Sequence, residues 1–114
     1  MGVIQKTEKG DVIECLIDSS NIIMSEYNQK NKSLVITFKA GTQYKYFDVL
    51  HRDYMRFEIS ESQGSVFNKT MRKYKYEKLD AIDVAPLKEQ IENIKNGTVQ
   101  RLSEENTGGG STEG

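Results

Sequence analysis

The chain has 114 residues, of which 36% are hydrophobic, and a formal net charge of −1. A chain of this size closes one modest core, which excludes a large enzyme. Its apolar runs are far shorter than the ~20 residues of a membrane helix, and its first residues lack the pattern of an export signal. We therefore expect a cytoplasmic protein with no membrane partner.

The first half of the chain alternates apolar and polar residues, which predicts an antiparallel meander. The clearest alternation places Leu34, Ile36 and Phe38 on one face, among β-branched neighbours. Further along, Tyr44 and Tyr46 again share a face. Turn residues separate these segments. The expected strands are residues 12–17, 22–27, 33–38 and 42–47.

After Asp48, which is a candidate helix N-cap, the apolar residues recur at intervals of three and four residues. Residues 50–59 are expected to form an amphipathic helix on the sheet. A second short helix is expected to begin at Ser62, with Gly64 permitting a tight turn between the two helices. Residues 74–76 alternate once more and predict a closing extended piece.

A third helix is predicted over about residues 84–96, because Pro86 suits a first turn and Gly97 a helix end. Residues 98–114 are polar and rich in glycine and serine, so we expect a flexible tail after a single domain over 1–97. The fold class is therefore α+β: a small antiparallel meander with two short helices packed on it and an additional C-terminal helix.

The net charge conceals a basic centre. Residues 28–78 carry eleven Lys and Arg against five Asp and Glu, whereas both flanks are acidic. Affinity for long nucleic acids grows with the number of phosphates neutralised, so the whole chain is a poor general nucleic-acid binder. A small anion needs fewer cations. The alternative is that these side chains only keep the surface soluble.

The segment around Gly64 has the composition of a phosphate site. The first turn of a helix leaves backbone N–H groups free, and Ser62 and Ser65 could add hydroxyl groups there. Arg72 could bind phosphate oxygens through two parallel hydrogen bonds. The competing interpretation is an ordinary serine cap that binds nothing.

Tyr44 and Tyr46 could stack on a nucleobase, a contact worth ~1 to 3 kcal/mol per base. Alternatively, both rings belong to the core and only their hydroxyl groups reach its rim. Five of the six tyrosines lie in the basic centre, which favours a base-contacting surface.

No catalytic constellation is recognisable. His51 lacks a partner in a nucleophile motif, Cys15 reads as a buried small hydrophobe, and Glu58 and Glu61 are more simply solvated. One cysteine and one histidine also cannot form a zinc cluster. We expect no enzyme activity, no metal and no cofactor.

A Tyr-x-Tyr at the centre of the chain, followed by Ser-x-Gly-x-x-Phe-Asn, resembles the KTSC domain. This resemblance covers about residues 19–78 and implies a small antiparallel sheet with helices packed against it. RNA binding has been suggested as the function of the family. The resemblance rests on Ser19-Ser20-Asn21-Ile22, Tyr27, Leu34-Val35-Ile36-Thr37-Phe38, Gly41, Tyr44-Lys45-Tyr46, Val49, Tyr54, Ser62-Gln63-Gly64, Phe67-Asn68, Arg72 and Tyr74-Lys75-Tyr76.

In size, architecture and site chemistry the chain is also similar to phage anti-CBASS and anti-Thoeris sponges. That resemblance implies a homo-oligomer, a dimer or tetramer, that sequesters a cyclic oligonucleotide or an ADP-ribose derivative without cleaving it. The narrow apolar stripe of the third helix fits such assembly. The alternative is a module for single-stranded RNA or tRNA. The expected ligand-binding residues are Tyr44, Tyr46, Ser62, Gly64, Ser65, Phe67, Asn68, Lys69, Arg72 and Tyr74.

Overall fold

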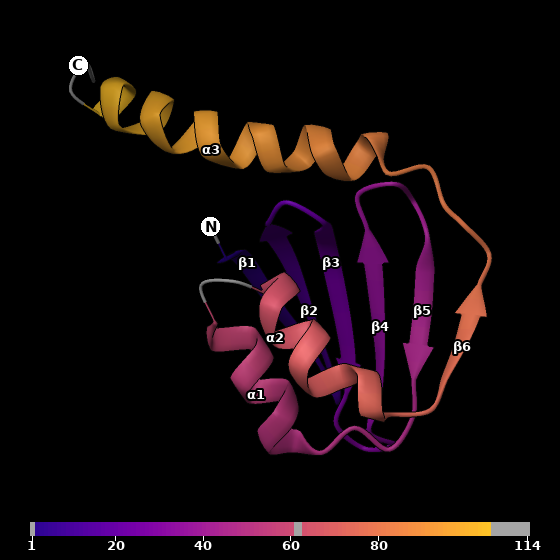
Figure 1. Ribbon diagram of the computed structural model, residues 1–114. Coiled ribbons are helices and arrows are strands. Elements are labelled where there is room, and N and C mark those ends of the chain that lie inside the picture. Colours follow the sequence, from indigo (N-terminus) through magenta and orange to yellow (C-terminus); the bar gives the residue numbers. More distant parts are fainter. Residues whose placement is uncertain (1, 61–62, 106–114) are drawn as a thin grey trace. The chain divides into compact units, whose positions relative to one another are not determined.

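Six strands form one antiparallel sheet in which each strand pairs with the next along the chain (Figure 1). The structure is a computed structural model that describes residues 2–60 and 63–105, with side chains up to residue 96. The strand order is therefore that of a simple meander, as the alternation predicted. The strands are β1 (Gly2–Lys9), β2 (Val12–Asp18), β3 (Ile22–Asn28), β4 (Ser33–Phe38), β5 (Gln43–Tyr46) and β6 (Tyr76–Leu79).

Two helices between β5 and β6 cover one face of this sheet (Figure 1). They are α1 (His51–Ile59) and α2 (Gln63–Thr70), and α2 continues into a 3-10 turn at Met71–Lys73. With the C-terminal helix α3 (Ala85–Glu105), the predicted α+β class is confirmed. Among the described residues, no helix is both long and apolar enough to cross a membrane.

The core lies between the two helices and the covered face of the sheet. Tyr54 and Phe57 of α1 and Met71 of the 3-10 turn are fully buried against it. Tyr27 stacks on Tyr54 with ring centroids 4.3 Å apart. The sheet contributes Ile13, Cys15, Ile17, Ile22, Leu34 and Ile36, which explains why Cys15 is a buried small hydrophobe as expected.

Strand β1 was not expected from the sequence. It is mostly polar, and it forms because its backbone pairs with β2 from Gly2 opposite Asp18 to Lys9 opposite Val12. An edge strand with charged side chains has little apolar alternation to detect. The one local signal is the turn that follows, where Gly10 adopts a positive φ of 59°.

The start of α1 corrects one expectation, since Asp48 is not its N-cap. Asp48 has a positive φ of 56° and lies in the preceding loop. The N–H of Val49 donates to the carbonyl of Lys32 at 2.8 Å, and α1 begins only at His51. Leu50 is the N-cap, without a side-chain cap bond.

Helix α3 belongs to a second unit, which begins at Ala85 and is described by itself. It continues past Gly97, the expected helix end, to Glu105. Five of the eight residues that follow Gly97 in the helix are good helix formers and help to offset its cost of ~1 kcal/mol: Gln100, Arg101, Leu102, Glu104 and Glu105. Residues 98–105 of the expected tail are therefore helical, and 106–114 lie outside the described residues.

Candidate functional site

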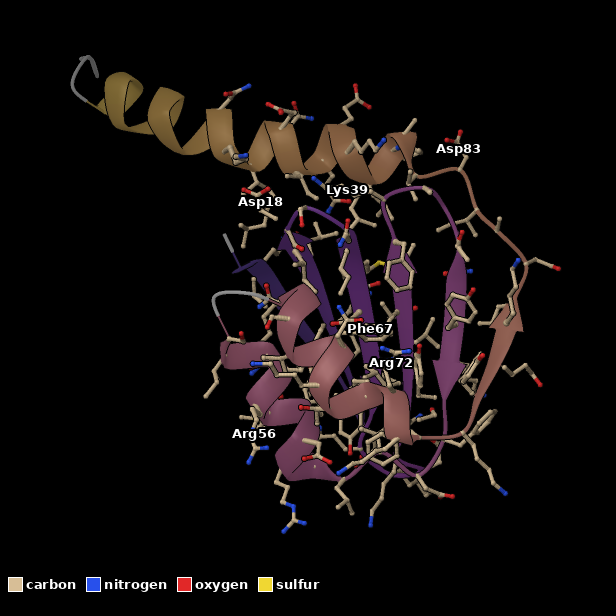
Figure 2. All side chains as sticks on the ribbon, viewed as in Figure 1. Asp18, Lys39, Arg56, Phe67, Arg72 and Asp83 are labelled. Carbon is tan, nitrogen blue, oxygen red and sulfur yellow. The ribbon has the colours of Figure 1, made fainter. Side chains whose placement is uncertain are left out.

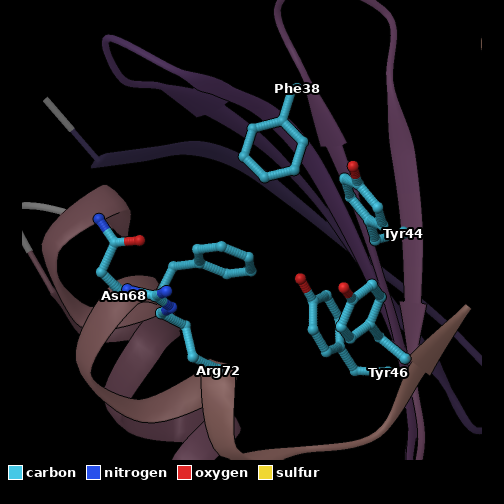
Figure 3. Close-up of a pocket in the computed structure, with 7 residues that line it drawn as sticks. Phe38, Tyr44, Tyr46, Asn68 and Arg72 are labelled. Carbon is cyan, nitrogen blue, oxygen red and sulfur yellow. The ribbon is translucent and has the colours of Figure 1, made fainter. Parts of the chain in front are cut away.

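A hollow of about 300 Å³ lies between the second half of the sheet and the end of α2. Figure 3 shows Phe38 and Tyr44 reaching it from the sheet and Asn68 and Arg72 reaching it from the helical side. We name this the aromatic hollow. Its lining residues are Phe38, Tyr44, Tyr46, Phe67, Asn68, Arg72 and Tyr76.

Sheet register places the rings of the hollow. Tyr46 stands opposite Leu34 on β4 and Tyr76 on β6, and Tyr44 stands opposite Ile36. Directly opposed residues share a face, so these tyrosines lie on the same side as the core. Because the helices do not extend over the sixth strand, Tyr76 remains 61% exposed while Tyr46 is buried.

Four of the ring pairs meet at nearly right angles, whereas the rings of Tyr46 and Tyr76 are tilted by 38°. The Phe67 ring stands edge-on to Phe38 and to Tyr46, with centroid distances of 5.5 Å in both cases. Tyr44 stands edge-on to Phe38 at 6.0 Å and to Tyr76 at 5.5 Å. Such edge-to-face contacts hold each ring in a fixed plane. The hollow therefore presents rigid aromatic walls.

Arg72 and Asn68 supply the polar part of the hollow. They are four residues apart at the end of α2 and the start of the 3-10 turn, so both side chains project from one helical face. Figure 2 shows Arg72 beside Phe67 over the sheet. Both polar side chains are exposed. Among the described lining residues, none is acidic.

Tyr46 keeps its proton over the physiological range. Burial, and then the neighbouring Tyr44 and Tyr76 side chains, raise the pKa of Tyr46 to about 12. Its hydroxyl group is thus available as a neutral donor or acceptor at the bottom of the hollow.

The structure brings together five of the predicted site residues: Tyr44, Tyr46, Phe67, Asn68 and Arg72. It adds Phe38 and Tyr76. Phe38 had been placed on one strand face with Leu34 and Ile36, without a role in the site. It lies at the end of β4, where it is half-buried. A second Tyr-x-Tyr motif, Tyr74-Lys75-Tyr76, is the feature of the sequence that could have indicated Tyr76 as a site residue. Only the pairing of β5 with β6 shows which of its two tyrosines faces the hollow.

The remaining predicted residues of α2 do not line the hollow. Gly64 is helical rather than a turn residue, because α2 already begins at Gln63. Ser65 and Lys69 are exposed on α2, and Ser62 lies outside the described residues. At 1.5 Å per residue, the backbones of Gly64 and Arg72 are about 12 Å apart along the axis. The expected phosphate site combining the glycine segment with Arg72 is therefore not assembled in the hollow.

The side chain of Gln63 makes the link between α1 and α2 that had been expected of Gly64. Gln63 is fully buried, and its amide donates to the carbonyl of Ser60 at 2.6 Å and of Phe57 at 3.4 Å. These contacts satisfy carbonyl groups at the end of α1. This role of Gln63 was not predicted from the sequence.

Tyr74 lies outside the lining of the hollow. Its hydroxyl donates to the carboxylate of Asp53 and accepts from the N–H of Leu50 at 3.2 Å. Lys73 pairs with the same carboxylate at 3.1 Å. Tyr74 thus ties the segment before β6 to the first turn of α1, which is a structural role.

A second hollow lies on the opposite face of the sheet. It has a volume of about 250 Å³ and is lined by Thr7, Lys9, Val12, Glu14 and Glu26. Glu14 and Glu26 are directly opposed on β2 and β3. Burial, and then the charge of Glu14, raise the pKa of Glu26 above its usual range. Within the described residues, no group of three or more His, Cys, Asp or Glu side chains could hold a metal ion.

The sequence profile described as the KTSC domain matches residues 18–76, which is more than half of the chain. The chain belongs to the KTSC domain family. Its fold is similar to the crystal structure of a KTSC domain protein from Yersinia pestis, with a TM-score of 0.56 and 25% sequence identity. The similarity covers 67% of this chain and 97% of that one.

A comparison with curated proteins gave no significant match. The KTSC match spans β3 to the start of β6, together with the last residue of β2. All seven lining residues of the aromatic hollow fall within it. The hollow is therefore part of the KTSC domain itself, whereas β1 and α3 lie outside the match.

Proposed function

We propose that this KTSC domain protein is a non-enzymatic binding protein that sequesters a small nucleotide second messenger. The observation that carries the proposal is the aromatic hollow, in which five rings and the cation of Arg72 surround one space. Rings of this kind stack on a base, and a guanidinium binds phosphate oxygens in a bidentate manner. The edge of the base would be read by Asn68.

The charge of the hollow favours a base and phosphate over a cationic ligand. Perpendicular aromatic walls also suit quaternary ammonium groups, which are attracted to ring faces. Arg72 would repel such a group, and no described lining residue is an acid that could offset this repulsion. An anionic aromatic ligand fits both the rings and the guanidinium.

The size of the hollow indicates how much of the ligand one chain would hold. Sites for small molecules occupy about 300 to 1,000 Å³, and this hollow, at about 300 Å³, is at the lower limit. One base would fill it, and the rest of a cyclic oligonucleotide would extend beyond it. A homo-oligomer, a dimer or tetramer, would enclose the remainder, and light scattering with and without nucleotide tests this assembly.

Sequestration would serve to remove a signal in the cytoplasm, as in phage evasion of CBASS or Thoeris immunity. A protein that acts stoichiometrically must bind its signal with a dissociation constant well below the signal concentration, and nanomolar binding corresponds to about −12 kcal/mol. Several rings together with phosphate contacts are a more credible source of that affinity than a single exposed cation.

A ligand panel tests the proposal directly. The purified chain would be titrated calorimetrically with cyclic dinucleotides, cyclic trinucleotides and ADP-ribose derivatives, with choline as the cationic control. We expect one nucleotide class to bind and choline not to bind. Recovery of the intact nucleotide after denaturation is expected for a binder, whereas a degraded product would contradict the non-enzymatic proposal.

Arg72→Ala provides the matched variant. Arg72 is exposed, so its removal should leave the unfolding temperature almost unchanged while abolishing detectable nucleotide binding. Lys30→Ala, in the loop between β3 and β4, removes the same charge far from the hollow along the chain and is expected to bind normally. Full affinity in Arg72→Ala would exclude the aromatic hollow as the site.

Single-stranded RNA is the second candidate ligand, favoured by the exposed ring of Tyr76 on edge strand β6. A bound RNA chain could continue over that edge of the sheet. A long RNA contacts many cations of the protein, so its affinity falls steeply with salt concentration, whereas the affinity of a compact ligand with two charges falls little. A salt titration with an oligonucleotide series therefore separates the two functions.

A further inference from the structure

We infer that Lys78 is a second phosphate-binding group of the aromatic hollow, so that the preferred ligand carries phosphate on both sides of one nucleoside. This inference rests on the proposed function and narrows its ligand class. A doubly phosphorylated nucleoside unit occurs in phosphodiester-linked cyclic oligonucleotides. ADP-ribose derivatives instead place their two phosphates together on one side of the adenosine.

The position of Lys78 follows from sheet register. Lys78 on β6 is directly opposite Tyr44 on β5, and Tyr76 is opposite Tyr46. Directly opposed residues share a face and have Cβ atoms about 4.5 to 5.5 Å apart. The long side chain of Lys78 therefore begins beside the Tyr44 ring, on the face that carries the hollow.

Arg72 approaches from the opposite side. It belongs to the 3-10 turn after α2 and lines the hollow with Phe67 and Asn68, on the helical side in Figure 3. The rings of Tyr44 and Tyr76 belong to the two strands that carry Lys78. The aromatic walls thus have a cation toward the helices and another at the sheet edge.

Both cations are free to bind a ligand. Arg72 and Lys78 are exposed, and among the described residues no carboxylate forms an ion pair with either of them. Lys73, by contrast, pairs with Asp53. A nucleoside whose base stacks on the rings between the two cations would direct its 5′ phosphate toward one cation and its 3′ phosphate toward the other.

Lysine and arginine would contribute differently to this binding. The guanidinium of Arg72 holds one phosphate with a fixed geometry, whereas the ammonium of Lys78 is a flexible point charge. Loss of Lys78 should therefore weaken binding of the doubly phosphorylated ligand by roughly 3- to 10-fold. The loss of Lys78 should not change the affinity for a ligand whose only phosphate is bound by Arg72.

The test uses mononucleotides that differ only in phosphate number. The 5′-monophosphates, 3′-monophosphates and 3′,5′-bisphosphates of the four common nucleosides would be titrated into the full chain, Lys78→Gln and Lys45→Gln. Lys45 is on the same pair of strands as Lys78 but opposite Glu77, on the other face of the sheet. It therefore controls for the change in net charge.

We expect the unmodified chain to prefer a bisphosphate to both of its monophosphates. Lys78→Gln should lose this preference and retain its affinity for the better monophosphate, while Lys45→Gln behaves as the unmodified chain. A bisphosphate preference that persists in Lys78→Gln, with binding otherwise intact, would overturn the role of Lys78 and leave the proposed function standing. Absence of any nucleotide binding to the unmodified chain, the larger cyclic ligands included, would overturn both.

Discussion

The hydroxyl group of Tyr74 donates a hydrogen bond to the carboxylate of Asp53, which is 3% exposed in the first turn of α1. Tyr74 had been expected to bind ligand, but its hydroxyl group bonds to Asp53 and its side chain does not line the aromatic hollow. It holds the segment leading to β6 against α1, and it thereby helps to fix β6 and the ring of Tyr76 beside the aromatic hollow.

Tyr74→Phe is expected to lower the free energy of unfolding by about 1.5 to 3 kcal/mol at neutral pH, because it removes a bond to a charged group. The Tyr74 hydroxyl, and then Lys73, hold the pKa of Asp53 below its usual range. A lowered folded-state pKa contributes stability above the usual pKa of about 3.9, and this stability is lost as pH falls through the folded-state pKa. Urea unfolding at neutral pH and at about pH 3 should show a smaller difference between variant and unmodified chain in acid. An equal loss at both values would contradict this electrostatic account.

Glu26→Gln is expected to stabilise the protein at neutral pH. Glu14 and Glu26 are directly opposed, and like charges in that position are destabilising. Because the folded-state pKa of Glu26 is raised, its contribution is most favourable below the usual pKa of about 4.3 and is lost as pH rises through the folded-state value. The variant should therefore unfold at a higher temperature than the unmodified chain at neutral pH, and this gain should vanish at about pH 4. Thermal unfolding monitored by circular dichroism measures this difference, and a difference that does not change with pH would contradict the raised pKa of Glu26.

Gly41→Ala should be far more damaging than Gly10→Ala. Gly41 has a φ of 99°, and an added Cβ would lie 2.5 Å from the carbonyl oxygen of Ile82. That backbone cannot withdraw easily, because the Ile82 N–H donates to the Gly41 carbonyl at 3.0 Å. Gly10 has a φ of 59° with nothing near its Cβ, so alanine there costs only about 1 to 2 kcal/mol of left-handed strain.

Chemical denaturation of the two glycine variants provides the comparison. We expect a loss of about 3 kcal/mol or more for Gly41→Ala. Equal losses in the two variants would show that the turn shifts to accept the new methyl group.

Tyr76→Ala should weaken nucleotide binding without unfolding the protein. The ring is 61% exposed, so its removal from the edge strand costs little core packing. One stacked ring contributes about 1 to 3 kcal/mol, which corresponds to a loss of roughly 5- to 150-fold in affinity. Tyr76→Phe retains the ring and should retain the affinity in calorimetric titration. A loss of affinity in both variants would assign the contribution to the hydroxyl group instead.

The meander could be predicted because its inner strands obey a two-residue period. Leu34, Ile36 and Phe38 alternate with more polar neighbours, and the structure forms β4 over the same six residues. Strand β1 escaped prediction for the opposite reason. Strand β1 pairs with β2 through backbone N–H and C=O groups, and this pairing does not depend on which side chains the strand carries. An edge strand also needs no apolar face, so it leaves no alternating pattern in the sequence.

Five of the seven lining residues of the hollow were predicted, because residue type indicates what chemistry a side chain can perform. Tyr44, Phe67 and Arg72 had been grouped for stacking and phosphate binding, and all three line the hollow. Tyr74 and Tyr76 had the same local context, yet one bonds to Asp53 and the other lines the hollow. That difference depends on contacts with α1 and β5, far away in sequence.

The sequence by itself determined the inner strands, the existence of the helices and which of their faces are apolar, since these follow from local periodicity and turn chemistry. Strand β1 and the full length of α3 did not follow from it. The sequence also supplied the aromatic rings and the cations. Only the tertiary structure decided that Phe38, Phe67 and Tyr76, from two strands and a helix, enclose one space with Arg72. The physical reason is that periodicity specifies the face of an element, whereas the packing of whole elements selects which faces meet.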